Sequence, residues 1–406
     1  MWRCDPPTRL VFAAVAGLAA AAAGRPLLGL AVAVPWRPRL LLAAVALAAA
    51  LWGGTRVAAL ETRTLRPGPA NLRLVVTSAP SGDRALVRVP DAGEDVLLQA
   101  PGYRPVLGAV YQASGRLSPI DPPVRDYYAT QGAHLQLRAS RLRRLGQRGG
   151  GWGVVDRLHA GALRRLGADR DPPPARALVA GVTLGETGSL PAAVRDQFRS
   201  SGLYHLVAVS GQNVAVVTVF VLICLALLGV IGAPARVAAV GLVLLYVLVT
   251  GAGPSIVRAG VAGGLVAVAW LGSRPVARWH LFACGAAVCL ALNPLDLFNP
   301  GFQLSFAAVW AIFAVAPRLQ PAVGSAVAVS VACTLVTTPI AWWHFGRLAP
   351  LSVPANLLAL PAVAPLLVSG LAAIVLGSVW PPLAAPALAL ADLLAGYLLW
   401  VARLCS

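Results

Sequence analysis

The sequence predicts a polytopic α-helical membrane protein with a small soluble β-barrel inserted in its first half. Hydrophobic residues make up 58% of the 406 residues and charged residues only 12%, whereas a soluble domain carries about 25% charged residues. Acids almost disappear after residue 205, where only Asp296 and Asp392 remain. Residues 56–170 differ from both flanks, because they contain 18 arginines and nine acids and include short alternating runs.

The first 55 residues are expected to anchor the chain in the membrane. Residues 10–34 and 39–55 are rich in Ala, Leu and Val, and a membrane-spanning helix needs about 20 apolar residues. The first run is interrupted at Gly24-Arg25-Pro26, so two spans, or one span and a short re-entrant piece, both fit. Apolar sequence continues beyond this interruption, which argues against a cleaved signal peptide.

Residues 56–145 are expected to form the soluble domain, on the outer side of the membrane. Five short segments in it are β-branched or alternate between apolar and polar residues, and Gly, Pro and Asp turns separate them. The expected strands are Asn71–Ser78, Arg84–Val89, Asp95–Gln99, Val106–Ala113 and His134–Ala139. Five strands of this length predict a small closed barrel, with the OB-fold as the favoured candidate. Such barrels often bind single-stranded nucleic acid.

A basic cluster lies at the end of this domain and runs into residues 146–204, which are expected to be a basic amphipathic helical linker beside the membrane. Anionic lipid headgroups are the favoured partner of such a cluster. DNA phosphates are the main rival, because they need the same positive charge. The net charge of +18 fits either partner. The DNA-contact candidates are Arg138, Arg141, Arg143, Arg144 and Arg148.

Residues 205–406 are expected to form a bundle of about eight membrane spans. Several of the apolar runs are short or contain Gly and Pro, which lipid tolerates only where protein covers the backbone or where the backbone lines a wet cavity. The sequence therefore predicts more than a set of plain anchors. By length the expected spans are 206–232, 237–251, 256–272, 280–293, 302–316, 321–341, 354–378 and 383–402.

Four segments of this bundle are too polar or too irregular for ordinary membrane helices: Gly202–Val214, Gly253–Gly260, Asn293–Phe306 and Thr337–Ala359. Polar groups within a membrane are costly unless they face a cavity or a partner, so these segments hold the candidate functional residues. The channel or motif candidates are His205, Ser210, Gly211, Asn213, Ser255, Arg258, Gln303, Ser305 and Asn356.

The roles of these residues stay open at this stage. Arg258 fits a pore-lining cation that attracts phosphate and equally fits a structural charge bonded to neighbouring polar groups. For Gln303, Ser305 and Asn356, hydrogen bonds that bridge helices are favoured over a role in a pore.

Enzyme chemistry is not expected from this sequence. A serine hydrolase needs a serine beside a histidine base, but Ser210 and His205 are five residues apart, which places them about 140° apart around a helix. The five histidines are dispersed and no Cys or His metal spacing is present, so neither a metal site nor a cofactor is expected.

The four polar segments resemble those of the ComEC family of competence proteins. The family carries a His-Leu-x-x-x-Ser-Gly segment like HLVAVSG here, and Pro-Ser-x-x-Arg-Ala, which Pro254–Ala259 matches. It also carries Asn-Pro…Gly-Phe-Gln-Leu-Ser-Phe, which Asn293–Phe306 matches, and a Phe-Gly…Asn-Leu-Leu ending, which Phe345–Leu358 matches. The order agrees, and short anchors followed by an OB-like outer domain also fit the family.

The resemblance implies a multi-pass protein of the bacterial cytoplasmic (inner) membrane that forms a channel for single-stranded DNA during natural transformation. Its implied partners are single-stranded DNA, membrane lipids, a DNA receptor and a cytoplasmic ATPase or helicase. A homo-oligomer is left open. The phosphate-binding loop GxxxxGK[ST] is absent from this sequence, so other subunits are expected to supply the energy.

Two departures from the family pattern bear on this expectation. Many members have a second histidine after the Ser-Gly pair, near the position of Asn213 in this chain, so no role is carried over for it. Many members also continue into a metallo-β-lactamase-like domain, and this chain carries no His-x-His-x-Asp cluster. The chain is therefore expected to be the conduit without the nuclease-like enzyme.

A small-molecule permease with an accessory soluble domain is the alternative function. Interrupted helices at the middle of a membrane are equally typical of permeases. That alternative accounts for neither the basic β-domain nor the four segments.

Overall fold

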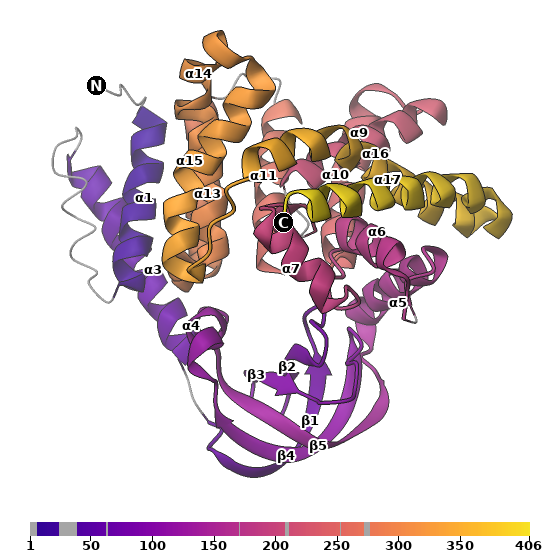
Figure 1. The fold of residues 1–406 in the computed structure, drawn as a ribbon. Helices are drawn as coiled ribbons and strands as arrows, with labels where there is room; N and C mark the ends of the chain where they lie inside the picture. The colour runs from indigo at the N-terminus through magenta and orange to yellow at the C-terminus, as the bar shows by residue number, and fades with distance from the viewer. Residues whose placement is uncertain are drawn as a thin grey trace.

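The computed structural model describes residues 6–23, 39–61, 64–169, 171–207, 211–251, 253–271 and 277–406. It consists of a small β-barrel and a helical bundle that covers one end of the barrel (Figure 1). The predicted combination of a small β-barrel and apolar helices is confirmed, because a closed five-stranded barrel is inserted into a chain of apolar helices.

Two N-terminal helices form the first element of the bundle, α1 (Pro6–Ala22) and α3 (Arg39–Glu61). They pack closely, since a Cβ at Gly17 would lie 2.0 Å from the carbonyl oxygen of Ala46. The interruption at Gly24-Arg25-Pro26 lies outside the described residues.

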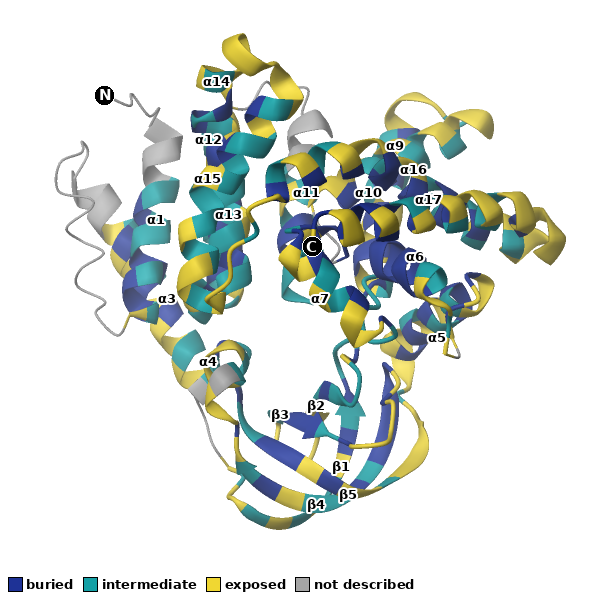
Figure 2. Cartoon of the chain, in the orientation of Figure 1, coloured by how far each residue is buried: buried dark blue, intermediate teal, exposed yellow. Residues whose placement is uncertain are grey.

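The region expected to be the soluble domain is a closed barrel of five strands in the order β1-β2-β3-β5-β4. Neighbouring strands are antiparallel except β3 and β5, which are parallel. Apolar side chains alternate into a core that includes the fully buried Leu74, Val87 and Leu98, and the strands accordingly alternate between buried and exposed residues in Figure 2. The strands are β1 (Gly68–Val76), β2 (Arg84–Val89), β3 (Glu94–Gln99), β4 (Ala109–Pro119) and β5 (Ala133–Gln147).

All five expected strands are present, and the main difference is the length of β5. This strand runs for 15 residues to Gln147 and so contains most of the basic cluster. It pairs with β4 up to its last residue, Gln147, with two irregularities in register. Helix α4 (Pro122–Ala129) connects β4 to β5.

The region expected to be a surface linker contains three helices: α5 (Gly150–Arg165), α6 (Pro174–Leu184) and α7 (Ala192–Ser200). Of these, α6 is not at the surface. Every residue from Ala177 to Leu184 is buried, and α6 belongs to the same apolar core as α16 and α17 (Figure 2). The helix is therefore a central part of the bundle, because the two longer helices cover it.

Each of the eight expected apolar runs contains a helix. Four of the described helical segments are long and apolar enough to cross a membrane, or five if the pair α13 and α14, bent by 56°, is one span. Others, such as α9 and α12, are apolar but shorter. The bundle elements are α8 (Tyr204–Val207), α9 (Gly211–Leu227), α10 (Gly232–Val249), α11 (Pro254–Leu271), α12 (Arg278–Leu292), η1 (Pro294–Phe298), α13 (Pro300–Ala314), α14 (Ala316–Val323), α15 (Ser325–Phe345), α16 (Ser352–Val379), η2 (Pro381–Leu383) and α17 (Ala384–Leu404).

Candidate nucleic-acid interface

The outward face of β1, β4 and β5 carries five exposed arginines. Arg138, Arg141 and Arg143 lie on β5, and the residues between them or beside them, such as Leu137 and Leu142, contact the barrel core. On β4, Arg116 lies directly opposite Arg138. Arg73 of β1 lies in the same cross-strand row as Arg143, with Gln112 of β4 between them.

We call Arg73, Arg116, Arg138, Arg141 and Arg143 the outer basic face. Among the residues that the structure describes, no carboxylate forms an ion pair with any of them. Like charges directly opposite one another on a sheet are destabilising, so the pair Arg116 and Arg138 favours a bound anion. Arg144 is also exposed, at the register irregularity near the end of β5.

Arg148, predicted as a DNA contact, has a different environment. Its Nε donates to Oδ2 of Asp156 at 2.6 Å, and its Nη2 donates to Oδ1 at 2.8 Å. The Asp156 side chain is fully buried and that of Arg148 is 19% exposed. The guanidinium is therefore occupied by a buried carboxylate, and Arg148 joins the end of β5 to α5.

The segment Asn293–Phe306 forms the contact between bundle and barrel. Asn293 and Asn299 each precede a proline and cap η1 and α13, with Oδ1 accepting from the backbone N–H of Leu295 and Gly301 respectively. Each Nδ2 is then free to donate to the barrel. Asn293 reaches the carbonyl oxygen of Thr130 at 2.7 Å, and Asn299 reaches its Oγ1 at 3.2 Å.

This use of both ends of the amide explains why asparagine stands at these positions. Aspartate or serine caps a helix equally well. An ionised carboxylate, however, has no donor, and a serine hydroxyl carries its donor and acceptor on one atom, whereas asparagine accepts at the cap through Oδ1 and donates across the junction through Nδ2. The sequence pattern indicates the segment as a whole, but it indicates no particular role for these two asparagines or for Thr130. The Asn-Pro pairs indicate two helix caps. No local signal indicates Thr130 as their partner, because it is 163 residues from Asn293.

Arg258 is buried where α11 meets the start of α13. Its side chain is 7% exposed, and a Cβ at Gly301 would lie 3.0 Å from its Nη2. Within the described part of the chain, its Nε and Nη1 have no hydrogen-bond partner. Asp296 interacts with it electrostatically but is not in ion-pair contact. Arg258 therefore lies beneath the barrel contact and not on an open surface.

The first polar segment contributes to packing between helices. Asn213 is buried, and its Nδ2 donates to the carbonyl oxygen of Val182 at 3.0 Å, which joins α9 to α6. His205 of α8 is exposed, and its Nδ1 donates to the carbonyl oxygen of Gly202 at 3.0 Å. Gly211 is the first residue of α9. Ser210 lies outside the described residues, so the hydrolase geometry is not tested.

The remaining candidates are spread over three helices. The expectation that Gln303 bridges helices is confirmed, because its Nε2 donates to the carbonyl oxygen of Leu297 at 2.9 Å and its Oε1 accepts from Nε2 of His344 at 2.8 Å. Ser255 lies half-buried in the first turn of α11. Ser305 is exposed on α13 and Asn356 half-buried on α16. No group of three or more possible metal ligands occurs among the described residues.

Comparison with known proteins agrees with the segment analysis. The model of the Competence protein family matches residues 182–406, which is more than half of the chain. ComE operon protein 3 of Bacillus subtilis (strain 168) is 30% identical over 193 residues, which are 47% of this chain and 25% of that protein. The uncharacterized protein YcaI of Escherichia coli (strain K12) is 28% identical over 226 residues, 51% of this chain and 30% of that protein.

The chain thus aligns with less than a third of the length of these curated relatives. No solved structure matches it significantly. The family match begins in α6 and runs to residue 406, so it includes the capping asparagines and the bundle helices from α7 to α17. The chain belongs to the Competence protein family.

Proposed function

We propose that this chain is the conduit through which single-stranded DNA enters the cell during natural transformation. The observation that carries the proposal is the outer basic face, on which five arginines from three strands remain exposed without a carboxylate partner among the described residues. Membership of the Competence protein family supports the same role.

The barrel would receive the strand. Its order, β1-β2-β3-β5-β4 with β3 and β5 parallel, supports assignment as an OB-type barrel. OB-folds bind single strands by combining a positive groove for the phosphates with aromatic side chains for the bases. A duplex would meet the same charge, but its bases are already paired and stacked.

The helical bundle would form the path across the membrane. Its helices are apolar, and several are short, bent at α13 and α14, or interrupted by proline within α15 and α16. Interrupted helices at membrane depth are tolerated where they line a wet cavity or are covered by protein. A multi-pass location in the bacterial cytoplasmic membrane, with the barrel outside, follows from this role.

The proposal assigns no catalytic step to these residues. A DNA receptor outside, a cytoplasmic ATPase or helicase inside, and any nuclease activity would belong to other proteins or domains. A second copy of the chain is compatible with the proposal but not required by it.

Salt-dependent DNA binding tests the receiving role. Fluorescent oligothymidylate is titrated with the full chain in detergent between about 50 mM and about 200 mM salt, because each phosphate contact to a single strand contributes a slope of about −0.7. Changing Arg73, Arg116 and Arg143 to Gln should reduce the slope by about 2 if each arginine contacts one phosphate. Arg157, Arg164 and Arg165, exposed on α5 and changed together to Gln, provide a control that removes the same number of charges.

The expected result is strong binding at low salt, a shallower slope for the outer-face variant and an unchanged slope for the α5 variant. Absence of binding at low salt, or equal slopes for all three proteins, would remove the receiving role from the barrel.

A further inference from the structure

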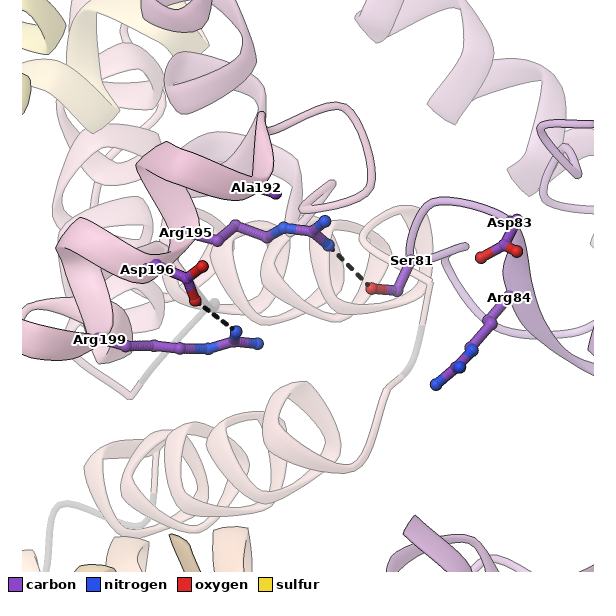
Figure 3. Close-up of a pocket in the computed structure, with 7 residues that line it drawn as sticks. All are labelled: Ser81, Asp83, Arg84, Ala192, Arg195, Asp196 and Arg199. Carbon is purple, nitrogen blue, oxygen red and sulfur yellow. Dashed lines mark hydrogen bonds and ion pairs between the residues drawn. The ribbon is translucent and has the colours of Figure 1, made fainter. Parts of the chain in front are cut away.

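A cleft of about 300 Å³ opens between the barrel and α7, on the side of the barrel that faces the bundle. One wall is the turn that joins β1 to β2, and the opposite wall is α7 (Figure 3). The lining residues are Ser81, Asp83, Arg84, Ala192, Arg195, Asp196 and Arg199.

Helix α7 turns its charged face toward this cleft because its other face is buried. Val194 and Phe198 are buried in the bundle core, and Arg195 and Arg199 extend from an adjacent side of the helix, about 100° around its axis. Figure 3 shows these two side chains reaching toward the barrel, while Arg84 reaches from the barrel into the same space.

The cleft keeps a small excess of positive charge, because three arginines line it against the two carboxylates of Asp83 and Asp196. Asp196 is shared by two arginines, with Nη1 of Arg199 at 3.2 Å and Nη1 of Arg347 at 3.9 Å. Arg195 donates a long hydrogen bond of 3.5 Å to Oγ of Ser81. Arg84 forms no ion pair with any carboxylate that the structure describes. The guanidinium groups are therefore only partly occupied by the protein itself.

Three tyrosines lie near this cationic cleft, and Tyr204 directly contacts one of its lining residues. The Arg199 guanidinium lies over the Tyr204 ring, 5.0 Å from its centroid. Across the junction, α4 presents Tyr127 and Tyr128, whose rings meet edge to face with centroids 5.2 Å apart. Tyr127 interacts electrostatically with Tyr204, and Tyr128 with Arg84.

Tyr127 is recessed but still reaches solvent. Its side chain is 41% exposed, yet burial by the surrounding protein raises the pKa of its phenol. Because 41% of the residue is exposed, a planar ligand has access to its ring. The three tyrosines come from α4 and α8, which belong to the barrel domain and to the bundle respectively.

We propose that this cleft is a second binding site for single-stranded DNA, at which Arg84, Arg195 and Arg199 contact phosphates while Tyr127 and Tyr204 stack on bases. The site rests on the proposed function and deepens it, since it hands the strand from the barrel to the bundle. Arginines interleaved with aromatic rings are the combination that holds single strands without reading their sequence. Unpaired bases are required, because only they expose a face for stacking.

Photochemical cross-linking tests this site in the full chain. Oligothymidylate carrying 5-iodouracil is bound at low salt and irradiated, and the cross-linked peptides are identified by mass spectrometry. Cross-links at Tyr127 or Tyr204 that disappear at high salt are the expected result. Cross-links confined to other parts of the chain would overturn the proposal.

Matched variants separate stacking from folding. Tyr204→Phe keeps the ring and should keep the affinity, whereas Tyr204→Leu should weaken binding by roughly tenfold, a typical loss for one stacked base. Changing Arg84 and Arg195 together to Gln should lower the salt slope by about 1.4, and the double α5 variant, Arg157→Gln with Arg164→Gln, should leave it unchanged.

The outcomes distinguish this site from the proposed function. If the chain binds no single-stranded DNA, both fail. If the chain binds DNA through the outer basic face but Tyr204→Leu and the cleft arginine variant bind as tightly as the original protein, only the cleft proposal fails.

Discussion

Nδ2 of Asn293 donates a hydrogen bond of 2.7 Å to the carbonyl oxygen of Thr130, which ties the bundle to the barrel at the end of α4. A second link runs through α5, which Arg148 joins to the end of β5. On this helix, Nδ1 of His159 donates to the carbonyl oxygen of Val249 on α10 at 2.7 Å. Because these links come from separate helices, the barrel is held in a defined orientation, with β4 and β5 on its side away from the bundle (Figure 1).

The bond between Asn299 and Thr130 should be measurable as a coupling energy. Asn299→Ala removes a helix cap and a hydrogen bond from a buried site, and we expect it to cost about 2 kcal/mol of unfolding free energy. Thr130→Val removes the acceptor hydroxyl. Combined, the two changes should cost about 1 kcal/mol less than the sum of the single changes, as measured by chemical denaturation in detergent.

Asn293 provides the control for this cycle. Its partner is the backbone carbonyl of Thr130, which Thr130→Val leaves in place. Asn293→Ala and Thr130→Val should therefore be additive within about 0.5 kcal/mol. Equal coupling for both asparagines would contradict the assignment of their two partners.

Arg148 should be needed for stability, unlike its neighbours on β5. Arg148→Ala leaves the Asp156 carboxylate fully buried without its partner, which typically costs about 3–5 kcal/mol. Arg144→Gln changes an exposed side chain and should stay within about 0.5 kcal/mol. The double change Arg148→Ala with Asp156→Ala should recover part of the loss. Thermal unfolding that shifts equally in Arg148→Ala and Arg144→Gln would contradict this account.

Glu186 should make the folded chain less stable as pH rises. Burial raises the pKa of its carboxyl from the ordinary value of 4.5 to about 7, against a smaller lowering by the N–H of Gly188. A raised pKa means that the folded state holds the proton more tightly, so its stabilising contribution is complete below about pH 4.5 and is lost as pH rises through about 7.

Glu186→Gln removes this titrating carboxyl. The difference in stability between the variant and the original protein therefore isolates the contribution of Glu186 from those of other groups. The difference in unfolding free energy between Glu186→Gln and the original protein should grow by on the order of 2 kcal/mol from about pH 5 to about pH 8. His159 lies 3.9 Å away, and burial lowers its pKa, so its own contribution rises with pH and appears in both proteins. A difference that does not change with pH would refute the raised pKa.

Gly370 should report on the burial of α6. A Cβ on Gly370 of α16 would lie 2.5 Å from Oγ1 of Thr183 on α6, so Gly370→Ala should destabilise the chain by about 1–3 kcal/mol through overpacking. Adding Thr183→Ala should restore stability, because it removes the atom in conflict. Gly396→Ala on α17 is the control, since a Cβ there meets no atom within 4 Å, and it should stabilise the helix by about 0.5–1 kcal/mol.

Local signals account for the parts of the fold that were predicted correctly. Arg84–Val89 has the same bounds in the structure as in the prediction, because turn residues flank a clear alternation. The length of β5 was missed, since its second half lies at the edge of the core and carries arginines in place of apolar residues. The sequence does not predict the burial of α6, because its apolar run is too short for a membrane span. The helix is buried because α16 and α17 pack against it in one apolar core.

The outer basic face could be predicted only in part, because some of its arginines come together only through the pairing of distant strands. Arg138, Arg141 and Arg143 are neighbours in sequence, whereas Arg73 and Arg116 join them through strand register. Arg148 could not be separated from its neighbours by type or spacing, because its role is set by Asp156 across a glycine-rich turn. Register and pairing over long sequence distances are three-dimensional properties that composition does not encode.

Uptake of fluorescent DNA by the organism that encodes this chain tests the central claim most directly. In a strain from which the gene is deleted, we predict that DNA binds to the cell but stays outside, where added nuclease degrades it. The original gene should restore nuclease-resistant DNA, and a gene with the outer basic face changed to Gln should restore it poorly. Nuclease-resistant DNA that accumulates at the normal rate in the deletion strain would contradict the claim that this chain is the conduit.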